Sequence, residues 1–446
     1  MAHSQPTLLS LAALISDSTR AITSHLNENG HALPSFEEDG LKRYPHDPEL
    51  RRLRLQLVEA ASDLYQLAVG AADMCFLQPM LNNHDTMTLD LLNQFDFFTA
   101  IPLGGSATYE EISDKTRMPL SLVQRILRHA MTMRLFSEKP PGSGRIVHTA
   151  ATSLLCEDSH QRSWVGHNLE VIRPATMRVP ESIKKFSVGK DRPCQDVLKS
   201  GFALADLDGL EYPSTFWQYT ERDQLDKPEG FRSKRFAEAM QAAAATSAIQ
   251  AYQLLTTAYD WNGLGEVTVV DVGGSTGHDA KVLATDFPSL RLIVQDKPQN
   301  EGKFQNSLPP DLEARVSFQA HDFFTPQNVK AEVFLLKMVL HDWSDQAACA
   351  ILRNLIPALK PGGRILLCEN VAQRAFSEQG SRTLPYLFHR LASSFDLQML
   401  TVFNTLERGL KQWTTLVTDA DERLRIHNVF TLPGAVQSII EVVLDA

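Results

Sequence analysis

From residue 266 onward, apolar strand-like runs alternate with helical segments, and this alternation constrains the fold more than any other feature of the chain. The runs are EVTVVDV, RLIVQD, RVSFQAHDFF, EVFLLKMVL and RILLCE. Strands separated by helices in this way predict a doubly wound sheet whose strands are mostly parallel. We therefore expect an α/β domain over residues 261–446.

A helix and a pair of strands are expected in the rest of this region. Ser344 is a suitable N-cap for a helix over residues 344–359, and Pro361-Gly362-Gly363 is expected to end it. Residues 423–444 have the pattern of two strands joined at Pro433-Gly434.

The N-terminal part of the chain is predominantly helical. Helical patterns cover residues 1–30, 51–80 and 90–102, with a linker or ordered loop at 31–40. Residues 106–138 have the pattern of two short helices around a turn. The segment ends in the strand-like piece LFSE, and a second strand-like piece, GRIVHT, follows it. This order predicts a winged helix-turn-helix.

The winged-helix pattern leaves two interpretations open. A DNA reader needs a basic exposed face, but the second helix offers only Arg125, Arg128 and His129, and the chain has a formal net charge of −10. A structural module would instead pack or dimerise through its apolar faces. We favour the second interpretation and expect a homodimer with no nucleic-acid partner.

The length of 446 residues allows two or three domains. We expect a helical and winged-helix dimerisation domain at 1–165, a helical connector at 166–260, and the α/β domain at 261–446. The connector should include a long helix at 235–259.

The cysteines and the hydropathy pattern bear on the location of the protein. Five widely spaced cysteines without a CxxC pair fit a reducing compartment better than a disulfide framework or a zinc site. No apolar run reaches the roughly 18 residues of a membrane span. We expect a cytoplasmic protein without a membrane partner.

A glycine, carboxylate or histidine stands at the end of each of the five strand-like runs. These ends carry Gly273 and Gly274, then Asp296, then Asp322 with Phe323, then His341, and finally Glu369. Ligands bind to open α/β sheets at the carboxyl edge of the strands. Glycines allow close approach of a ligand, and a carboxylate after the second strand can bind ribose hydroxyls. Five such ends indicate one pocket rather than coincidence.

Each of these residues also has a structural interpretation. Gly-rich turns are often only tight turns, and the adjacent Gly273 and Gly274 do not make the GxGxxG spacing of a dinucleotide site. His341 can be a helix-start histidine, and Lys337 can extend out of the sheet edge. Glu407 can be an exposed residue beside Arg408. No carboxylate cluster has the spacing of metal ligands, so we expect no metal.

A family resemblance adds to this pattern. The segments DVGGSTGH, VQD, HDFF, LLKMVLHDWSD, LKPGGRILLCE and DLQMLTVFNTLER are similar to those of S-adenosylmethionine-dependent O-methyltransferases of the caffeate/flavonoid type, in particular their fungal relatives of secondary metabolism. The resemblance extends over nearly the whole chain and includes LPSFEEDG and WVGHNLE. The chain departs from the family pattern in having Gly409 after Arg408, and Lys297 where an apolar residue is commoner.

The resemblance implies that residues 261–446 are a catalytic Rossmann-like class I methyltransferase domain with an antiparallel last strand. It also implies that the connector at 166–260 contributes to the substrate pocket. It implies S-adenosylmethionine as cofactor, with S-adenosylhomocysteine as the product left after transfer. The implied cofactor contacts are Gly273, Gly274, Asp296 for the ribose, Asp322 and Phe323 for the adenine, and Lys337. The implied catalytic residues are His341 as general base with Glu369 and Glu407 beside it. Trp164, His167 and Met399 are implied to line the acceptor pocket, although ordinary helix core is the favoured role for each of them taken singly.

Two enzymatic functions remain open from the sequence. A phenol with a pKa of about 10 needs a base at neutral pH, and a positioned imidazole oriented by a carboxylate is suited to that task. We therefore favour methyl transfer to a phenolic or enolic hydroxyl of an aromatic secondary metabolite, such as a polyketide. The alternative is a non-methylating pericyclase or dehydratase of the same fold, which would use Lys337 as a cationic hydrogen-bond donor.

Overall fold

The structure is a computed structural model that describes residues 6–210, 213–245, 251–372, 385–432 and 435–445. The chain divides into two compact units, and both units are assembled from separate stretches of sequence. The first consists of residues 1–174, 220–243 and 385–387, and the second of residues 175–219, 244–384 and 388–446. The expected connector at 166–260 thus contributes to both units. The predicted three-part division stays a prediction.

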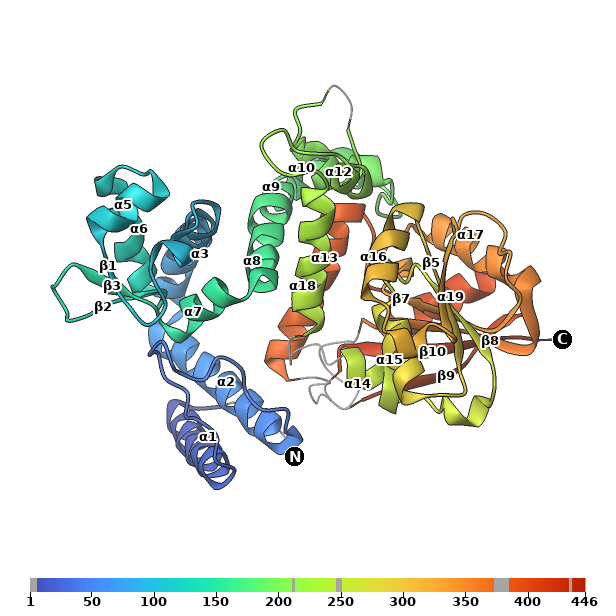
Figure 1. The fold of residues 1–446 in the computed structure, drawn as a ribbon, viewed down its shortest axis with the longest axis horizontal. Helices are drawn as coiled ribbons and strands as arrows, with labels where there is room; N and C mark the ends of the chain where they lie inside the picture. The colour runs from blue at the N-terminus through green and yellow to red at the C-terminus, as the bar shows by residue number, and fades with distance from the viewer. Residues whose placement is uncertain (1–5, 211–212, 246–250, 373–384, 433–434, 446) are drawn as a thin grey trace. The chain divides into compact units, whose positions relative to one another are not determined.

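The first unit is mainly helical (Figure 1). The pattern over residues 51–80 is not one helix as expected, because Gly70 has a φ of 79° that an α-helix does not allow. Two helices meet there. The helices assigned to this unit are α1 (Leu8–Glu28), α2 (Pro48–Val69), α3 (Ala71–Gln94), α4 (Phe97–Ala100), α5 (Tyr109–Thr116), α6 (Leu120–Thr132), α7 (Ala150–Glu157), α8 (Ser159–Gly166), a π-helix at His167–Ile172, and α13 (Phe231–Ala244).

Helices α5 and α6 are followed by two short strands, in the predicted order. β2 (Ser137–Glu138) and β3 (Arg145–Val147) pair antiparallel, and β1 (Ala107–Thr108) pairs with the other edge of β3. The two helices are amphipathic, and Ile112, Val123 and Leu127 are fully buried in one cluster with Phe98. This core fixes the small sheet against the helices.

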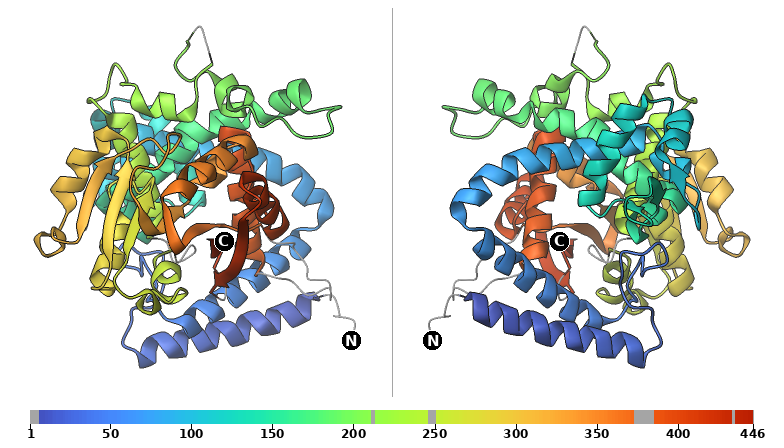
Figure 2. Two further views of the ribbon diagram at one scale, coloured as in Figure 1. Left: turned by 90° about the vertical axis from the view of Figure 1, so that its right-hand side faces the viewer. Right: turned by 90° about the vertical axis from the view of Figure 1, so that its left-hand side faces the viewer.

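The second unit contains a seven-stranded sheet in the order β6-β5-β4-β7-β8-β10-β9 (Figures 1 and 2). The first five strands in that order are parallel, whereas β10 is antiparallel to both neighbours. The predicted mostly parallel sheet with an antiparallel last strand is confirmed. The strands are β4 (Thr268–Val272), β5 (Arg291–Asp296), β6 (Val316–Ala320), β7 (Ala331–Lys337), β8 (Leu359–Asn370), β9 (Leu424–Thr431) and β10 (Gln437–Leu444).

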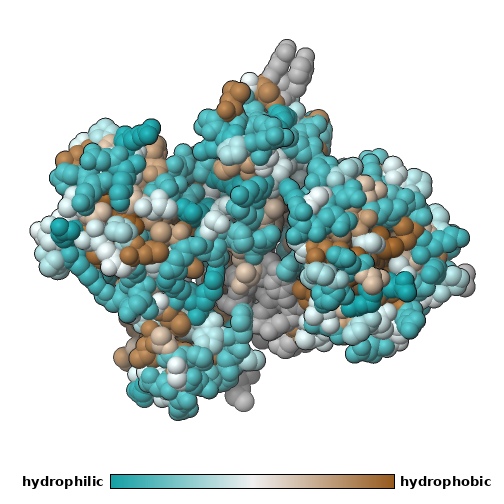
Figure 3. All heavy atoms as spheres, viewed as in Figure 1, coloured by the Kyte–Doolittle hydropathy of each residue, from teal (hydrophilic) through white to brown (hydrophobic). Residues whose placement is uncertain are grey.

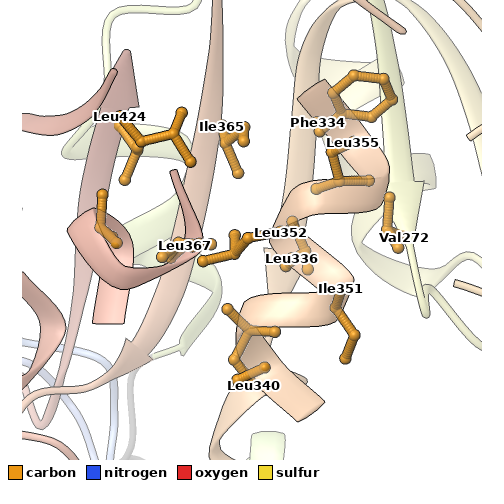
Figure 4. Close-up of a cluster of buried hydrophobic side chains, with 14 of the residues drawn as sticks. Val272, Phe334, Leu336, Leu340, Ile351, Leu352, Leu355, Ile365, Leu367 and Leu424 are labelled. Atoms are coloured by element: carbon orange, nitrogen blue, oxygen red, sulfur yellow. The ribbon is translucent and has the colours of Figure 1, made fainter. Parts of the chain in front are cut away.

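Helices cover both faces of this sheet because alternate strand residues point to opposite faces. Phe334 and Leu336 pack with α17 (Asp345–Leu355) and α19 (Leu410–Ala420), as Figure 4 shows for residues of α17. Val333 and Leu335 pack on the other side with α14 (Ala251–Thr257), α15 (His278–Asp286) and α16 (Glu301–Ser307). This explains why these strands are continuous apolar runs.

The remaining helices lie in the second unit or contain residues of both units. They are α9 (Arg173–Thr176), α10 (Val179–Phe186), α11 (Gly201–Ala205), α12 (Phe216–Glu221) and α18 (Tyr386–Phe403), with single 3₁₀ turns between several elements.

One boundary prediction needs correction, and two others involve residues that the structure does not describe. Ser344 does cap α17, since its side chain accepts a hydrogen bond from Ala347 N, but the helix and its 3₁₀ extension end at Ala358, and Pro361-Gly362-Gly363 lie within β8. The proposed helix over 235–259 is represented by α13 and α14 on either side of residues that the structure does not describe. The strand connection at Pro433-Gly434 also lies outside the described residues.

Candidate active site

The predicted polar residues do lie at the carboxyl ends of neighbouring strands. Gly273 follows β4, Asp296 ends β5, His341 follows β7 and Glu369 is the penultimate residue of β8. Because β5, β4, β7 and β8 are adjacent and parallel, these ends share one edge of the sheet.

The turn after β4 is built around a buried carboxylate that sequence reasoning missed. A Cβ at Gly274 would lie 2.3 Å from Oδ2 of Asp271, so only glycine fits there. Asp271 is 2% exposed, and its Oδ2 has no hydrogen-bond partner among the described residues. Burial raises the pKa of Asp271 to about 8. A buried acceptor without a donor is costly, and a cationic ligand over the turn would satisfy it.

The backbone N–H groups of this turn are partly used within the protein. Gly273 N and Gly274 N donate to the carbonyl oxygen of Gln295 at 2.8 and 3.2 Å. The two glycines therefore provide close backbone approach to a ligand rather than free N–H donors. The next residue, Ser275, donates its N–H to Oδ2 of Asp296 at 2.8 Å.

Asp296 is held in place by several donors. Besides Ser275 N, it accepts hydrogen bonds from Lys297 N at 2.7 Å and from Nδ2 of Asn300 at 2.8 Å, both at Oδ1. Because a carboxylate has about four lone-pair sites, Oδ2 retains capacity for a further donor such as a ribose hydroxyl.

Aromatic side chains lie next to the predicted adenine contacts. Oδ1 of Asp322 accepts a hydrogen bond from Phe324 N at 3.0 Å. The ring of Trp343 is 5.8 Å from Phe323 and 4.7 Å from Phe324, both edge to face. Trp343 belongs to the same turn as His341, so the predicted adenine contact and the predicted base are joined through packed side chains.

Lys337, at the end of β7, is paired with a carboxylate. Its Nζ lies 2.5 Å from Oδ1 of Asp279, in the first turn of α15, and its side chain is only 11% exposed. A lysine that extends into solvent is therefore wrong for this position. Asp279 was not singled out by the sequence.

His341 lies in a buried turn, and its ring is oriented by one of the two predicted glutamates. Nδ1 is 3.1 Å from Oε1 of Glu407, and Nε2 is 3.5 Å from Oδ1 of Asp342. His341 is 5% exposed and Glu407 is 4% exposed, so the structural alternative of an exposed Glu407 is wrong. Asn370, another residue that the sequence did not indicate, donates to the same Oε1 at 2.8 Å.

The charges around His341 favour its protonated form. Burial lowers the pKa of His341, but Asp342, Glu407 and Glu369 outweigh burial and raise it to about 10. Burial also raises the pKa of Asp342 to about 7 and that of Glu369 to about 7. His341 is thus a much stronger base than an ordinary imidazole.

Glu369 contacts the backbone of the turn rather than the imidazole. Its Oε1 accepts hydrogen bonds from Val339 N at 3.1 Å and Leu340 N at 2.8 Å, and Glu369 is fully buried. The two glutamates that flank the histidine in the predicted site therefore differ in their contacts: Glu407 contacts the ring and Glu369 holds the turn.

The predicted acceptor-pocket residues belong to different compact units. Trp164 and His167 lie in the first unit, with ring centroids 6.4 Å apart, and His167 is buried against Phe236. Met399 is buried on α18 in the second unit. A pocket lined by all three stays a prediction.

Two further observations concern ligands and membranes. Among the described residues, no three His, Cys, Asp or Glu side chains are grouped so that they could hold a metal ion. Within the same residues, no helix combines the length and the apolar character needed to cross a bilayer.

Comparisons with known proteins identify the family. Residues 214–421 match the model of the O-methyltransferase domain. The grayanic acid biosynthesis cluster O-methyltransferase of Cladonia grayi is 31% identical over 441 residues, which are 97% of this chain and 87% of the relative. The chain belongs to the S-adenosylmethionine-dependent O-methyltransferases of fungal secondary metabolism.

Solved structures share the fold of this methyltransferase. OxaC superimposes with a TM-score of 0.72 at 21% identity over 98% of this chain and 99% of that chain, and it has been solved in complex with S-adenosylhomocysteine and oxaline. A structure described as a pericyclic reaction enzyme superimposes with a TM-score of 0.70 at 19% identity, over 96% of this chain and 100% of that one. S-adenosylmethionine is the cofactor of the family. The glycine turn and the unpartnered Asp271 oxygen of this methyltransferase fit a ligand with a cationic amino group.

Proposed function

We propose that the enzyme methylates a phenolic or enolic hydroxyl of an aromatic secondary metabolite, with His341 as the general base. The observation that carries this proposal is the buried pair of His341 Nδ1 and Glu407 Oε1, 3.1 Å apart. A carboxylate on one ring nitrogen fixes the tautomer and leaves the other nitrogen, Nε2, as the one that can exchange a proton with an acceptor.

The contacts of the chain suggest a role for each cofactor residue. Asp296 would hold the ribose hydroxyls through its remaining lone pairs, and Asp322 and Phe323 would contact the adenine. Asp271 would accept a hydrogen bond from the amino group, and Lys337 would face the carboxylate of the methionine part. Bound S-adenosylmethionine supplies an electrophilic methyl group on a sulfonium, and the remainder leaves as a neutral thioether.

The raised basicity of His341 matches the acid that it must deprotonate. A phenol has a pKa of about 10, and the pKa of His341 is raised to about 10. In the fraction of molecules whose His341 is deprotonated, proton transfer from the hydroxyl to Nε2 therefore costs little, and the imidazolium that forms is stabilised by Glu407. The oxygen forms its bond to carbon as the proton moves to Nε2, and His341 then releases that proton to solvent.

A labelling experiment tests this function. The protein is incubated with methyl-labelled S-adenosylmethionine and a panel of mono- and dihydroxylated aromatic polyketides, with His341→Ala and the control His427→Ala, an exposed histidine on β9. Label should enter an organic-soluble product with the wild type and His427→Ala, and the rate should fall by about 10²–10⁴ in His341→Ala. An undiminished rate in His341→Ala would rule out its role as base.

The pericyclase or dehydratase alternative has a specific observation in its favour. A His341 with a pKa of about 10 is a cation at neutral pH and can donate a hydrogen bond to a substrate carbonyl. Cofactor binding without methyl transfer to any member of the panel, together with conversion of a labelled substrate to an isomer or dehydration product, would favour this alternative. Lys337→Met would then be the next variant.

We also propose that the enzyme is a homodimer and that its helical N-terminal unit provides the interface. Figure 3 shows hydrophobic side chains on the viewed surface over α1. Size-exclusion chromatography with light scattering should give twice the chain mass of 49.8 kDa. A monomer at micromolar concentration would contradict this proposal. The exposed large hydrophobic residues of α1, α2 and α3 are Leu8, Leu9, Val58, Tyr65, Leu67, Phe76, Met80, Leu81 and Met87.

A cytoplasmic location remains part of the proposal. All five cysteines are free thiols in the structure, which agrees with a reducing compartment.

A further inference from the structure

The turn that carries His341 is held by side chains from one distant segment of the chain. We define the base turn as residues 339–343 and the clamp segment as residues 405–408. Three carbonyl groups of the base turn accept hydrogen bonds from the clamp segment, which also supplies the Glu407 carboxylate to the imidazole. The two segments are more than 60 residues apart in sequence, so this contact is tertiary.

Arg408 makes most of these hydrogen bonds. Nη1 donates to Leu340 O at 2.9 Å, and Nη2 donates to Trp343 O at 2.8 Å. Nε and Nη2 also donate to Oδ1 of Asp345, at 3.0 and 2.8 Å, at the start of α17. The planar guanidinium thus holds both ends of the turn at fixed distances, which a lysine ammonium cannot reproduce.

The burial of Arg408 shows that these hydrogen bonds are needed. Arg408 is 1% exposed, and its guanidinium carbon lies 5.3 Å from the ring centroid of Trp413. An arginine withdrawn from water is tolerated when its donors are satisfied. Here the acceptors are mostly carbonyl groups of the base turn.

Thr405 holds the middle of the base turn. Its Oγ1 donates to the carbonyl oxygen of His341 at 2.6 Å, and both residues are buried. The clamp segment is itself anchored, because Glu407 N donates to Oδ1 of Asp396 at 2.7 Å and Ala372 N donates to Arg408 O at 3.1 Å.

We propose that Arg408 and Thr405 are positioning residues that set the place of the His341 imidazole, with Arg408 the more important of the two. The clamp segment fixes the ring at Nδ1 through Glu407 and fixes the backbone beneath the ring through Arg408 and Thr405. A displacement of about 1 Å at a reacting group can cost on the order of 10² in rate. The inference rests on the proposed role of His341.

The test compares Arg408→Met and Arg408→Lys with Arg353→Met. Arg353 lies on α17 and also donates to two carbonyl groups, Ala420 O and Asp419 O. Among the described residues, no hydrogen bond joins it to the base turn. We expect kcat to fall at least about tenfold in both Arg408 variants, with the KM for S-adenosylmethionine within about threefold of wild type. Arg353→Met should keep wild-type kcat even if its melting temperature falls.

A readout that needs no acceptor separates this inference from the proposed function. The titration of His341 is followed by NMR on protein labelled at histidine Cε1, with the signal assigned by its absence in His341→Ala. Arg408→Met should shift that titration to lower pH, because the imidazole moves away from Glu407, whereas Arg353→Met should not shift it.

The outcomes are distinct. If the wild type transfers no methyl group, the proposed function fails, but the NMR titration still decides whether the clamp exists. An unshifted titration and a kcat equal to that of Arg353→Met would overturn the inference. Should both Arg408 variants fail to fold, Thr405→Val removes only one hydroxyl donor. A two- to tenfold lower kcat in that variant would support the inference, and unchanged kcat and titration would overturn it.

Discussion

The two halves of the strand edge differ in what their polar side chains contact within the protein. On the side of β7 and β8, the base turn is held by Glu369, Thr405 and Arg408, and the imidazole by Glu407. On the side of β4 and β5, Asp296 retains an acceptor site and Asp271 has an oxygen without a partner among the described residues. The protein alone places the imidazole and its turn, and the second oxygens of Glu369 and Glu407 have no partner among the described residues. On the cofactor side, the remaining acceptors lie at the glycine turn and at Asp296, where a ligand would complete them.

This difference fits the proposed division of work. A general base must keep its geometry through the reaction, so its contacts come from the protein itself. A cofactor must enter and leave in every cycle, so its site keeps acceptors that are satisfied only when it is bound. Substitutions should therefore affect different constants: kcat for the residues that contact His341 and its turn, and cofactor affinity for the residues at the ends of β4 and β5.

The largest effect is expected for Glu407→Gln. Glutamine keeps the shape of the side chain but removes the charge that stabilises the imidazolium, so kcat should fall on the order of 10²-fold. Cofactor affinity, measured by calorimetry, should stay within threefold. The matched control is Glu332→Gln, at the opposite end of β7, where the carboxylate pairs with Lys360. A loss of cofactor affinity comparable to the loss of kcat would contradict the separate roles of the two sides.

A second prediction concerns Asp271→Asn on the other side. Asp271 can ionise when a cationic amino group binds, whereas an amide cannot, so the Kd for S-adenosylmethionine should rise about tenfold while kcat at saturation changes little. Asp311→Asn, on an exposed turn, serves as the control.

The same variant should change the pH dependence of stability. The folded-state pKa of Asp271 is raised to about 8, above an unfolded value near 4, so the folded protein binds one more proton between these pH values. Stability due to this group is therefore lost as pH rises from about 4 to about 8. The melting temperature of Asp271→Asn minus that of the wild type should therefore increase as pH rises over this range. The same difference at pH 5 and at pH 8 would contradict a buried acid with a raised pKa.

The smallest effect is expected for Ser344→Ala. Ser344 caps α17 through a 3.3 Å hydrogen bond from Ala347 N, so its loss should cost about 1 kcal/mol in the free energy of unfolding. Denaturant unfolding measures this change. Because the cap contacts the helix and not the base turn, kcat should remain within about twofold of wild type. A tenfold loss of kcat would mean that the position of the base turn depends on the cap of α17.

The strand positions and the polar strand ends could be predicted from the sequence, because buried parallel strands are continuous apolar runs. The segment RLIVQD matches β5 residue for residue. The break between α2 and α3 was missed because Gly70 interrupts a helical pattern that continues on both sides. Pro361-Gly362-Gly363 was read as a helix stop, although an extended chain also accommodates these residues in β8.

The contacts between side chains in the site could not be predicted from the sequence. His341 and Glu407 are far apart in the chain, and only the folded structure shows that Glu407, and not Glu369, contacts the imidazole. The burial of Arg408 could not be predicted, because a single arginine in a loop carries no signal of burial. The partners of Lys337 and the isolation of Asp271 likewise depend on tertiary packing.

The central claim is that the His341–Glu407 pair takes the proton of the acceptor hydroxyl, and the pH dependence of single-turnover methyl transfer tests it most directly. His341 with a pKa of about 10 is mostly protonated at neutral pH, so the wild-type rate should rise close to tenfold per pH unit from pH 7 toward 9. In Glu407→Gln the imidazole is less basic, and the plateau should begin at lower pH. A rate independent of pH over this range, or the same profile in both proteins, would contradict the account.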